Sequence, residues 1–121
     1  MPQITVDYSH PVEDAFDERD FARALHQAVV EIAAARPEAC MTLFRSSDSM
    51  AFGYEDPEAH GHAIVNVTIG LLAGRSEETR ARLTETVLEL VRAHVAPEEG
   101  VVLHASAEVR DLDPSYRKYD G

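Results

Sequence analysis

Two successive rounds of strand-like and helix-like hydrophobic patterning constrain the fold of this chain more than any other feature. In the first round, polar and apolar residues alternate over 3–8, which predicts a short strand with one buried face. Apolar residues then recur at three- and four-residue spacing over 17–36, which predicts a helix with Asp17 as its N-cap and Pro37 as its stop. The segment 41–52 predicts a second strand that a polar run interrupts.

The second round repeats this order after a predicted turn over 53–58. The Ile- and Val-rich segment 63–72 predicts a strand, and Ser76 is the expected N-cap of the helix that follows. Glutamates in the first turn of that helix suit the positive end of its dipole. Pro97 ends the helix, and 101–109 predicts the last strand.

This order predicts an α+β fold made of two β-α-β units. Each unit is expected to form a parallel crossover, which gives a four-stranded mixed sheet with two helices on one face. The opposite face then stays open, and a homo-oligomer is the simplest cover for it. With 121 residues, the chain is expected to be a single domain over 1–121. Its polar end, 111–121, is expected to be a tail that is loose or lies on a neighbouring subunit.

A formal net charge of −11 argues against several classes of partner. Nucleic acid and anionic membrane surfaces both attract basic proteins, so we expect neither a nucleic-acid partner nor a membrane partner. A small anionic substrate stays compatible with this charge, because a few arginines set a local potential opposite to the global one.

The sequence also predicts a cytoplasmic location. Cys40 is the only cysteine, so no intrachain disulfide forms and a reducing compartment fits. Segment 1–7 has neither the basic region nor the apolar run of a signal peptide. No apolar stretch reaches the ~20 residues that a membrane-spanning helix needs.

Pro2 is the first candidate for chemistry. Its side chain is small enough for removal of Met1, which leaves a free prolyl amine at the start of a predicted strand. That amine is basic, and the strand holds it in place, as a general base requires. The alternative is that proline at this position is only a tolerated start of the chain.

Two arginines are candidates for binding an anion. Arg45 lies within the predicted strand 41–52, where a charge is either solvated or held for a purpose. Arg75 lies where a strand meets a helix, and a helix start already favours anions. For both residues the alternative is an ordinary surface arginine.

The histidines and the cysteine predict no further site. His60 and His62 are two residues apart and can share a strand face, but no third ligand at suitable spacing accompanies them, so we expect no metal. No histidine motif matches Cys40, so we expect no nucleophilic role for it. The histidines inside regular elements are expected to pack or to lie on the surface: His26, His94 and His104.

Two segments carry a resemblance to a known family. Pro2-Gln3-Ile4-Thr5-Val6-Asp7-Tyr8-Ser9 resembles the N-terminal strand of tautomerase-superfamily enzymes. The segment 67–80 is similar to the strand, Gly-Arg-Ser junction and helix start of 5-carboxymethyl-2-hydroxymuconate isomerases, with the junction at 74–76. The resemblance extends over almost the whole chain, from Pro2 to about Val109.

The resemblance implies a homotrimer with active sites near the subunit boundaries. It implies that Pro2 is the catalytic base and that Arg75 helps to bind an anionic substrate. Arg45 matches a strand arginine of the family. The aromatic residues that follow this arginine in the family are replaced here by Ser47, Asp48, Ser49 and Met50, so the substrate stays open.

The expected activity is that of a cofactor-independent isomerase. It shifts a proton in an unsaturated 2-hydroxy or 2-oxo carboxylic acid, such as 5-carboxymethyl-2-hydroxymuconate, because the substrate's own carbonyl accepts the electrons. One alternative is a non-enzymatic ferredoxin-like module that binds a small ligand or a partner, since one fold serves many functions. Another is a relative that uses the same proline for hydration or decarboxylation.

Overall fold

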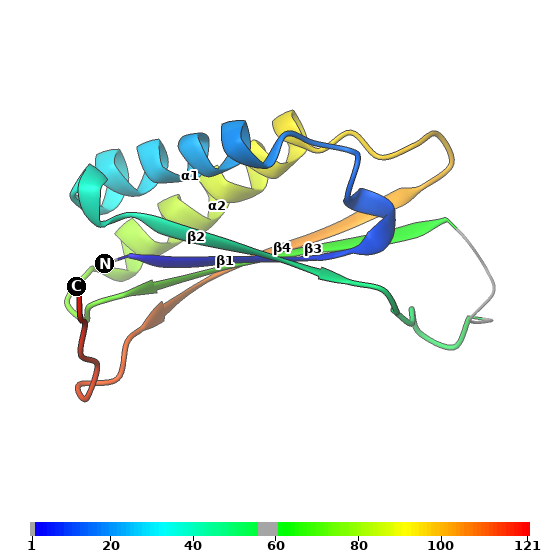
Figure 1. Ribbon diagram of the computed structural model, residues 1–121. Helices are drawn as coiled ribbons and strands as arrows, with labels where there is room; N and C mark the ends of the chain where they lie inside the picture. The colour runs from blue at the N-terminus through cyan, green and yellow to red at the C-terminus, as the bar shows by residue number, and fades with distance from the viewer. Residues whose placement is uncertain (1, 56–60) are drawn as a thin grey trace.

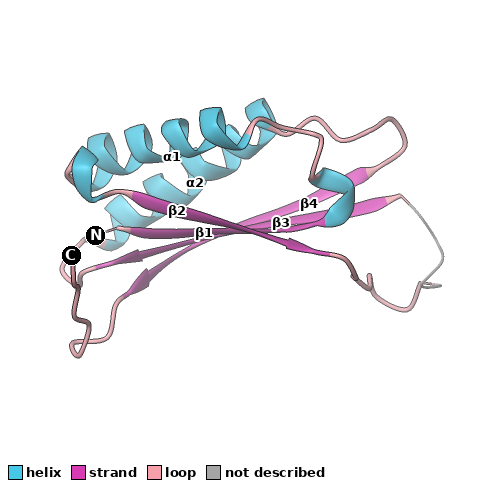
Figure 2. Cartoon of the chain, viewed as in Figure 1, coloured by secondary structure: helices cyan, strands magenta, loops and turns pink. Residues whose placement is uncertain are grey.

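The computed structural model describes residues 2–55 and 61–121. Within these residues the chain forms four strands and two long helices in the predicted alternation (Figures 1 and 2). In chain order they are β1 (Gln3–Ser9), α1 (Glu18–Ala33), β2 (Met41–Ser47), β3 (His62–Leu71), α2 (Glu77–His94) and β4 (Val102–Asp111). Two short 3-10 turns add to them: η1 (His10–Val12) and η2 (Pro37–Ala39).

The four strands form one mixed sheet in the order β2-β1-β3-β4. Strands β1 and β2 are parallel, β3 and β4 are parallel, and the central pair β1 and β3 is antiparallel. Both helices lie on one face of the sheet (Figure 1). The predicted pair of β-α-β units is therefore confirmed. The ferredoxin-like topology of the binding-module alternative is wrong, because the two strands of each unit are direct neighbours here and not split by a third strand.

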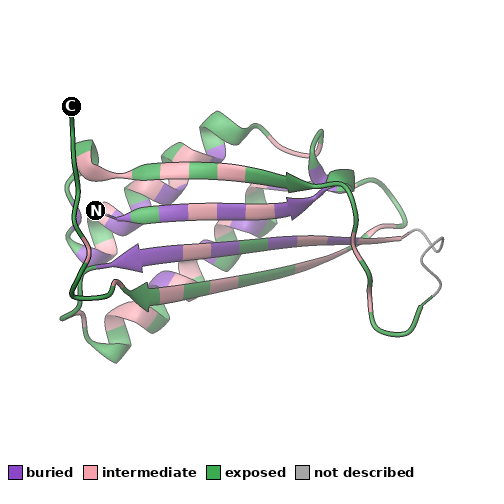
Figure 3. Ribbon diagram, turned by 60° about the horizontal axis from the view of Figure 1, so that its bottom comes forward, coloured by how far each residue is buried: buried purple, intermediate pink, exposed green. Residues whose placement is uncertain are grey.

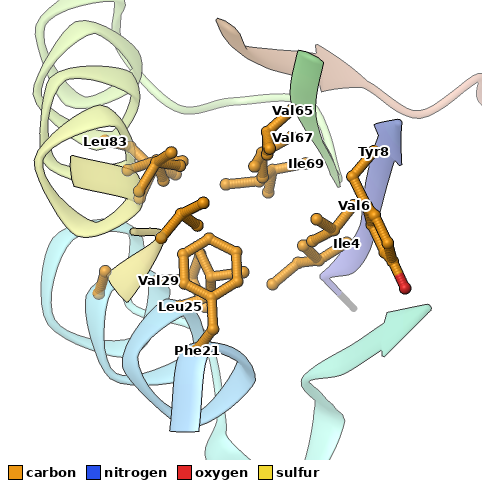
Figure 4. Close-up of a cluster of buried hydrophobic side chains, with 14 of the residues drawn as sticks. Ile4, Val6, Tyr8, Phe21, Leu25, Val29, Val65, Val67, Ile69 and Leu83 are labelled. Atoms are coloured by element: carbon orange, nitrogen blue, oxygen red, sulfur yellow. The ribbon is translucent and has the colours of Figure 1, made fainter. Parts of the chain in front are cut away.

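The core lies between the sheet and the helices (Figure 4). Alternate strand residues point into it, so that β1 contributes Ile4 and Val6 while β3 contributes Val67. Helix α1 packs Leu25 against them, and α2 packs Leu83. Each of these five side chains is at most 2% exposed, and burying one is worth about 1.5–3 kcal/mol.

Helix α1 begins as predicted but ends early. The Asp17 side chain accepts a hydrogen bond from the backbone N–H of Asp20 at 3.0 Å. The helix ends at Ala33, three residues before the predicted Arg36, because Ala34 turns into the left-handed region with φ 57°. Pro37 further disfavours helical backbone at the residue before it.

Strand β2 also ends early, at Ser47 and not at the predicted Phe52. The Ser47 hydroxyl donates to the backbone carbonyl of Ser49 at 3.0 Å, a local bond of the kind that competes with a strand ladder. In the predicted turn, Glu55 N–H donates to the Phe52 carbonyl at 3.1 Å, while residues 56–58 lie outside the described part of the chain.

Strand β4 is longer than predicted and leads into the polar end of the chain. It runs to Asp111, and Leu112 N–H then donates to the Leu71 carbonyl at 2.7 Å. The Leu112 side chain covers Gly70, where an added Cβ would lie 2.9 Å from it. The end of the chain thus returns to the end of the sheet where β1 begins (Figure 1). No helix among the described residues is long and apolar enough to cross a membrane.

Candidate functional site

Pro2 lies immediately before β1, one of the two central strands of the sheet. Its side chain is buried. Its carbonyl accepts a hydrogen bond from the Met41 backbone N–H at 3.4 Å, at the first residue of β2. The position of Pro2 is therefore fixed by a central strand, as the sequence predicts for a rigidly held group.

Arg75 lies at the same end of the sheet as Pro2. Gln3 pairs with Gly70, so β3 ends beside the start of β1, and Arg75 follows four residues after Leu71. Gly74 makes the intervening bend with φ 122°, a conformation that side chains rarely adopt. The structure thus brings Pro2 and Arg75 to one end of the sheet.

The guanidinium of Arg75 is bound mainly to backbone oxygens. Nε and Nη2 donate to the Ala33 carbonyl at 3.2 and 3.0 Å, and Nη1 donates to the Leu72 carbonyl at 3.1 Å. Ala33 is the last residue of α1, so Arg75 satisfies a carbonyl that the helix itself leaves open. Two of its five N–H groups serve this role, and a third binds the Leu72 carbonyl.

Arg45 lies on the open face of the sheet and forms a salt bridge. It pairs in register with Asp7 of β1, and the two side chains meet through Nε–Oδ1 at 2.7 Å and Nη2–Oδ2 at 3.0 Å. Hydrogen bonding to Asp7 and its negative charge raise the pKa of Arg45. This partner was not foreseen from the sequence, because only the strand register reveals it.

Within one chain, Arg45 is distant from Pro2. Met41 pairs with Gln3, and Arg45 is four residues further along β2, which corresponds to about 13 Å of strand. The structure therefore places Pro2 and Arg75 at one end of the sheet and Arg45 further along it.

A cleft of about 350 Å³ opens beside Arg45. Its walls come from the open face of the sheet, with Asp7 and Asn66, and from the loop after β2, with Ser49 and Met50. Asn66 Oδ1 accepts a hydrogen bond from the Ser106 hydroxyl at 2.6 Å. The cleft thus combines polar groups with apolar surface from residues such as Met50, Ala51 and Ile64.

Sequence reasoning missed a histidine pair at the other end of the open face. His62 Nδ1 and His104 Nε2 are 3.0 Å apart, and His62 Nε2 is 2.8 Å from Glu55 Oε2. The Phe52 ring stacks on both imidazoles, with centroid distances of 4.3 and 4.1 Å. In the register of β3 with β4, Ile64 pairs with His104, and this pairing places His104 beside His62.

His62 and His104 do not form a metal centre by themselves. Among residues 2–55 and 61–121, no group of three or more His, Cys, Asp or Glu side chains is arranged to hold a metal ion. His60, the other member of the predicted pair, lies outside the described residues.

Two further titratable groups are held neutral by burial. Burial, together with a hydrogen bond from its hydroxyl to Glu18 Oε1 at 2.8 Å, raises the pKa of Tyr8 to about 12. Burial also raises the pKa of the Cys40 thiol. The thiol donates a hydrogen bond from Sγ to the Arg36 carbonyl at 3.4 Å. A protonated thiol is a poor nucleophile.

Comparison with solved structures identifies the fold. No family model matches the chain, and no curated protein shows significant sequence similarity to it. It is similar to a 5-carboxymethyl-2-hydroxymuconate isomerase from Deinococcus radiodurans R1, with 18% identity, a TM-score of 0.78, and 98% of this chain and 90% of that chain covered.

Two other similar structures come from different enzymes. A fused 4-OT described as a symmetric trimer has 20% identity and a TM-score of 0.70, covering 91% of this chain and 85% of that one. A malonate semialdehyde decarboxylase inhibited by 3-bromopropiolate has 19% identity and a TM-score of 0.67, covering 98% and 89%. The chain therefore has the tautomerase-superfamily fold, which confirms the fold that the resemblance implies.

Proposed function

We propose that this chain is a cofactor-independent isomerase of the tautomerase type, with Pro2 as its base. The substrate is a small unsaturated 2-hydroxy or 2-oxo carboxylic acid, of which 5-carboxymethyl-2-hydroxymuconate is the example that the fold suggests. The observation that carries this proposal is the buried position of Pro2 at the start of the central strand, in a fold shared with an isomerase of that acid.

The proposed reaction is a proton shift through a dienolate. The neutral amine of Pro2 takes the proton from the 2-hydroxyl of a 2-hydroxy-2,4-dienoate, and the oxygen electrons form the C2 carbonyl. The C2=C3 electron pair shifts to form C3=C4, and the C4=C5 pair forms a new C5–H bond with the proton of the prolinium, which gives a 2-oxo-3-enoate. No atom or electron is gained or lost. General base catalysis of this kind is typically worth ~10²–10⁴-fold in rate.

This mechanism requires that Met1 is removed, because an amide nitrogen is not basic. A buried amine favours its neutral form, which is the form that a base needs. The surroundings of Pro2 thus support its proposed role: the residue is buried, and β1 fixes its position.

Arg75 and Arg45 are proposed to bind the acid. Arg75 has two free N–H groups at the Pro2 end of the sheet, and these suit a carboxylate or the developing oxyanion. Arg45 lies about 13 Å further along the sheet, so in this proposal it serves the site of a neighbouring subunit. A homotrimer that covers the open face supplies that arrangement, and one similar structure is described as a symmetric trimer.

The experiment combines intact mass with an ultraviolet assay. The protein, purified from a cytoplasmic preparation of its host, is weighed for loss of one methionine and assayed for ketonisation of 2-hydroxymuconate-type dienols. We expect turnover only in the form without Met1, and at least a hundredfold lower kcat for Pro2→Ala. A matched control carries one extra alanine before Pro2, which blocks the amine and keeps the side chain.

The outcomes separate the alternatives. Turnover that survives both the blocked amine and Pro2→Ala contradicts a role of Pro2 as base. Retained ligand binding with no turnover in any form favours the non-enzymatic binding module. Analysis of the products distinguishes isomerisation from decarboxylation, the activity of one of the similar structures.

A further inference from the structure

We infer that a groove along the outer side of α1 binds a small amphipathic carboxylate. The carboxylate lies at Arg19 and Arg23, and an apolar tail runs from there toward Pro37. This binding goes beyond the proposed function and does not depend on it, because the groove shares no lining residue with the cleft beside Arg45 and includes neither Pro2 nor Arg75.

The groove has the size of a small-molecule site. Its volume is about 510 Å³, and ligand sites usually measure about 300–1,000 Å³. It follows α1 from Arg19 to Glu31, and Pro37 of η2 lines the end beyond the helix. In its middle, His26 Nε2 lies 2.8 Å from the Thr42 hydroxyl of the edge strand β2. This hydrogen bond holds the helix and the strand together under the groove.

Arg19 and Arg23 give one end of the groove an unpaired positive charge. Of the eleven Lys and Arg side chains, only these two and Arg82 form no hydrogen bond or ion pair with the described residues. Arg19 and Arg23 are four residues apart on one helix, so their side chains are neighbours and repel each other. A carboxylate between them removes this repulsion and accepts charge-assisted hydrogen bonds from both.

The acidic residues at the start of α1 are engaged elsewhere. Asp17 accepts from the Asp20 backbone N–H at 3.0 Å, and Glu18 Oε1 accepts from the Tyr8 hydroxyl at 2.8 Å. In the described chain, no salt bridge joins Asp20 to either arginine of the groove. The first turn of a helix also favours a negative charge through its dipole. This end of the groove therefore attracts an anion.

The rest of the groove suits an apolar tail. The half-buried side chains of Ala22 and Val30 contribute apolar surface, and Pro37 continues it. Burial lowers the pKa of His26, so its ring is uncharged at neutral pH and adds flat, weakly polar surface. A ligand with a charged head and an apolar tail therefore matches both parts of the groove.

Glu31 is the acidic residue that lines the groove, and it lies far from the cationic end. It follows Arg23 by eight residues, which corresponds to about 12 Å along the helix. This distance exceeds the screening length of about 8 Å at physiological salt, so its repulsion of a carboxylate at Arg23 is weak.

The test is calorimetric binding of three probes: decanoate, butyrate and decyltrimethylammonium. Butyrate lacks most of the tail, and decyltrimethylammonium carries the opposite charge. We expect decanoate to bind at least tenfold more tightly than butyrate, since each buried methylene tightens binding by about fourfold. We expect no binding of decyltrimethylammonium. Equal affinities for decanoate and decyltrimethylammonium would indicate apolar adsorption alone and overturn the inference.

The variant that removes the cationic end combines Arg19→Gln with Arg23→Gln. We expect it to bind decanoate at least tenfold more weakly, because both charge-assisted hydrogen bonds are lost. The matched control combines Arg82→Gln with Arg92→Gln on α2 and changes the net charge by the same amount. It should keep the affinity of the unaltered protein. An equal loss in both variants assigns the effect to net charge and contradicts the inference.

Chemical-shift mapping locates decanoate on the unaltered protein and so does not depend on how well the variants fold. We expect the amide signals of Ala22, His26 and Val30 to shift. Shifts confined to Asn66 and the start of β1 would place decanoate on the open face or at the Pro2 end of the sheet, and would overturn the inference. None of these measurements requires turnover, so a failure of the proposed function leaves them unchanged.

Discussion

The two faces of the sheet are built from the same strands but differ in how far their side chains are buried. In β1, Ile4 and Val6 point toward the helices and are at most 2% exposed, whereas the alternating residues face the open side. Figure 3 shows this alternation, with buried segments concentrated in β1 and β3 and exposed ones in β2 and β4. The covered face thus carries the hydrophobic stabilisation of the fold.

The open face instead carries polar contacts between neighbouring strands. Three such contacts follow one another along the sheet: Asp7–Arg45, Asn66–Ser106 and His62–His104. Exposed apolar side chains lie beside them, including Leu43 at 70% exposed. The comparison teaches that a single strand can separate stability from recognition by alternating its side chains.

The largest expected effect is a loss of stability on the covered face. Leu25→Ala removes a fully buried side chain of α1, and we expect a loss of about 2–5 kcal/mol in the free energy of unfolding. Urea denaturation followed by circular dichroism measures it. The control Leu43→Ala, on the open face, should cost less than about 1 kcal/mol. Similar losses in both variants would break the contrast between the faces.

The next effect concerns assembly through the open face. If this face is covered by other subunits, Leu43→Glu places a charge in the interface, and we expect roughly a hundredfold weaker association with an unchanged circular dichroism spectrum. Light scattering after size-exclusion chromatography measures the mass. Leu88→Glu, at an exposed position of α2, is the control and should keep the assembly. Dissociation of the Leu88→Glu variant would instead place the interface on the helices.

A smaller effect is expected where Arg75 joins the end of α1 to the loop after β3. Arg75→Ala leaves the Ala33 and Leu72 carbonyls without this donor, and we expect a loss of about 1–3 kcal/mol in stability. Arg82→Ala, on the exposed side of α2, serves as the reference. Unchanged stability combined with a large rise in KM would assign Arg75 to the substrate and not to the helix end.

The smallest effect is a pH dependence at the edge of the core. Folding raises the pKa of Tyr8 from 10.0 to about 12, so the folded state holds this proton more tightly than the unfolded state. The contribution is therefore complete below pH 10 and is lost as the pH rises from 10 to 12. Tyr8→Phe should flatten this part of the stability profile in urea titrations. A profile that is unchanged in Tyr8→Phe would assign the loss to other groups.

The fold was largely predictable because its signals are local. Hydrophobic periodicity identified both β-α-β units, and the N-caps Asp17 and Ser76 act as predicted, accepting from backbone N–H groups at 3.0 and 3.1 Å. The end of α1 was predicted three residues too late because no glycine marks the left-handed turn at Ala34, and because Arg75, which lies 42 residues away in the sequence, binds the Ala33 carbonyl. Local patterns carry no information about such a partner.

The site was less predictable for the same reason. Arg45 was identified from its sequence context, but its neutralisation by Asp7 depends on the register of β1 with β2. The contact of His62 with His104 depends likewise on the register of β3 with β4. The role of Pro2 stays a prediction, because it concerns the chemistry of an amine and not its position.

The strand order β2-β1-β3-β4 reads the same when the two β-α-β units are exchanged. In this pseudo-symmetry the counterpart of Pro2 is Gly61, the residue before β3. Gly61 lies inside the chain, so its nitrogen belongs to a peptide bond and has no basicity. Duplicating the architecture within one polypeptide therefore does not duplicate the proposed base, so the proposed mechanism gives each chain one basic nitrogen for two equivalent halves.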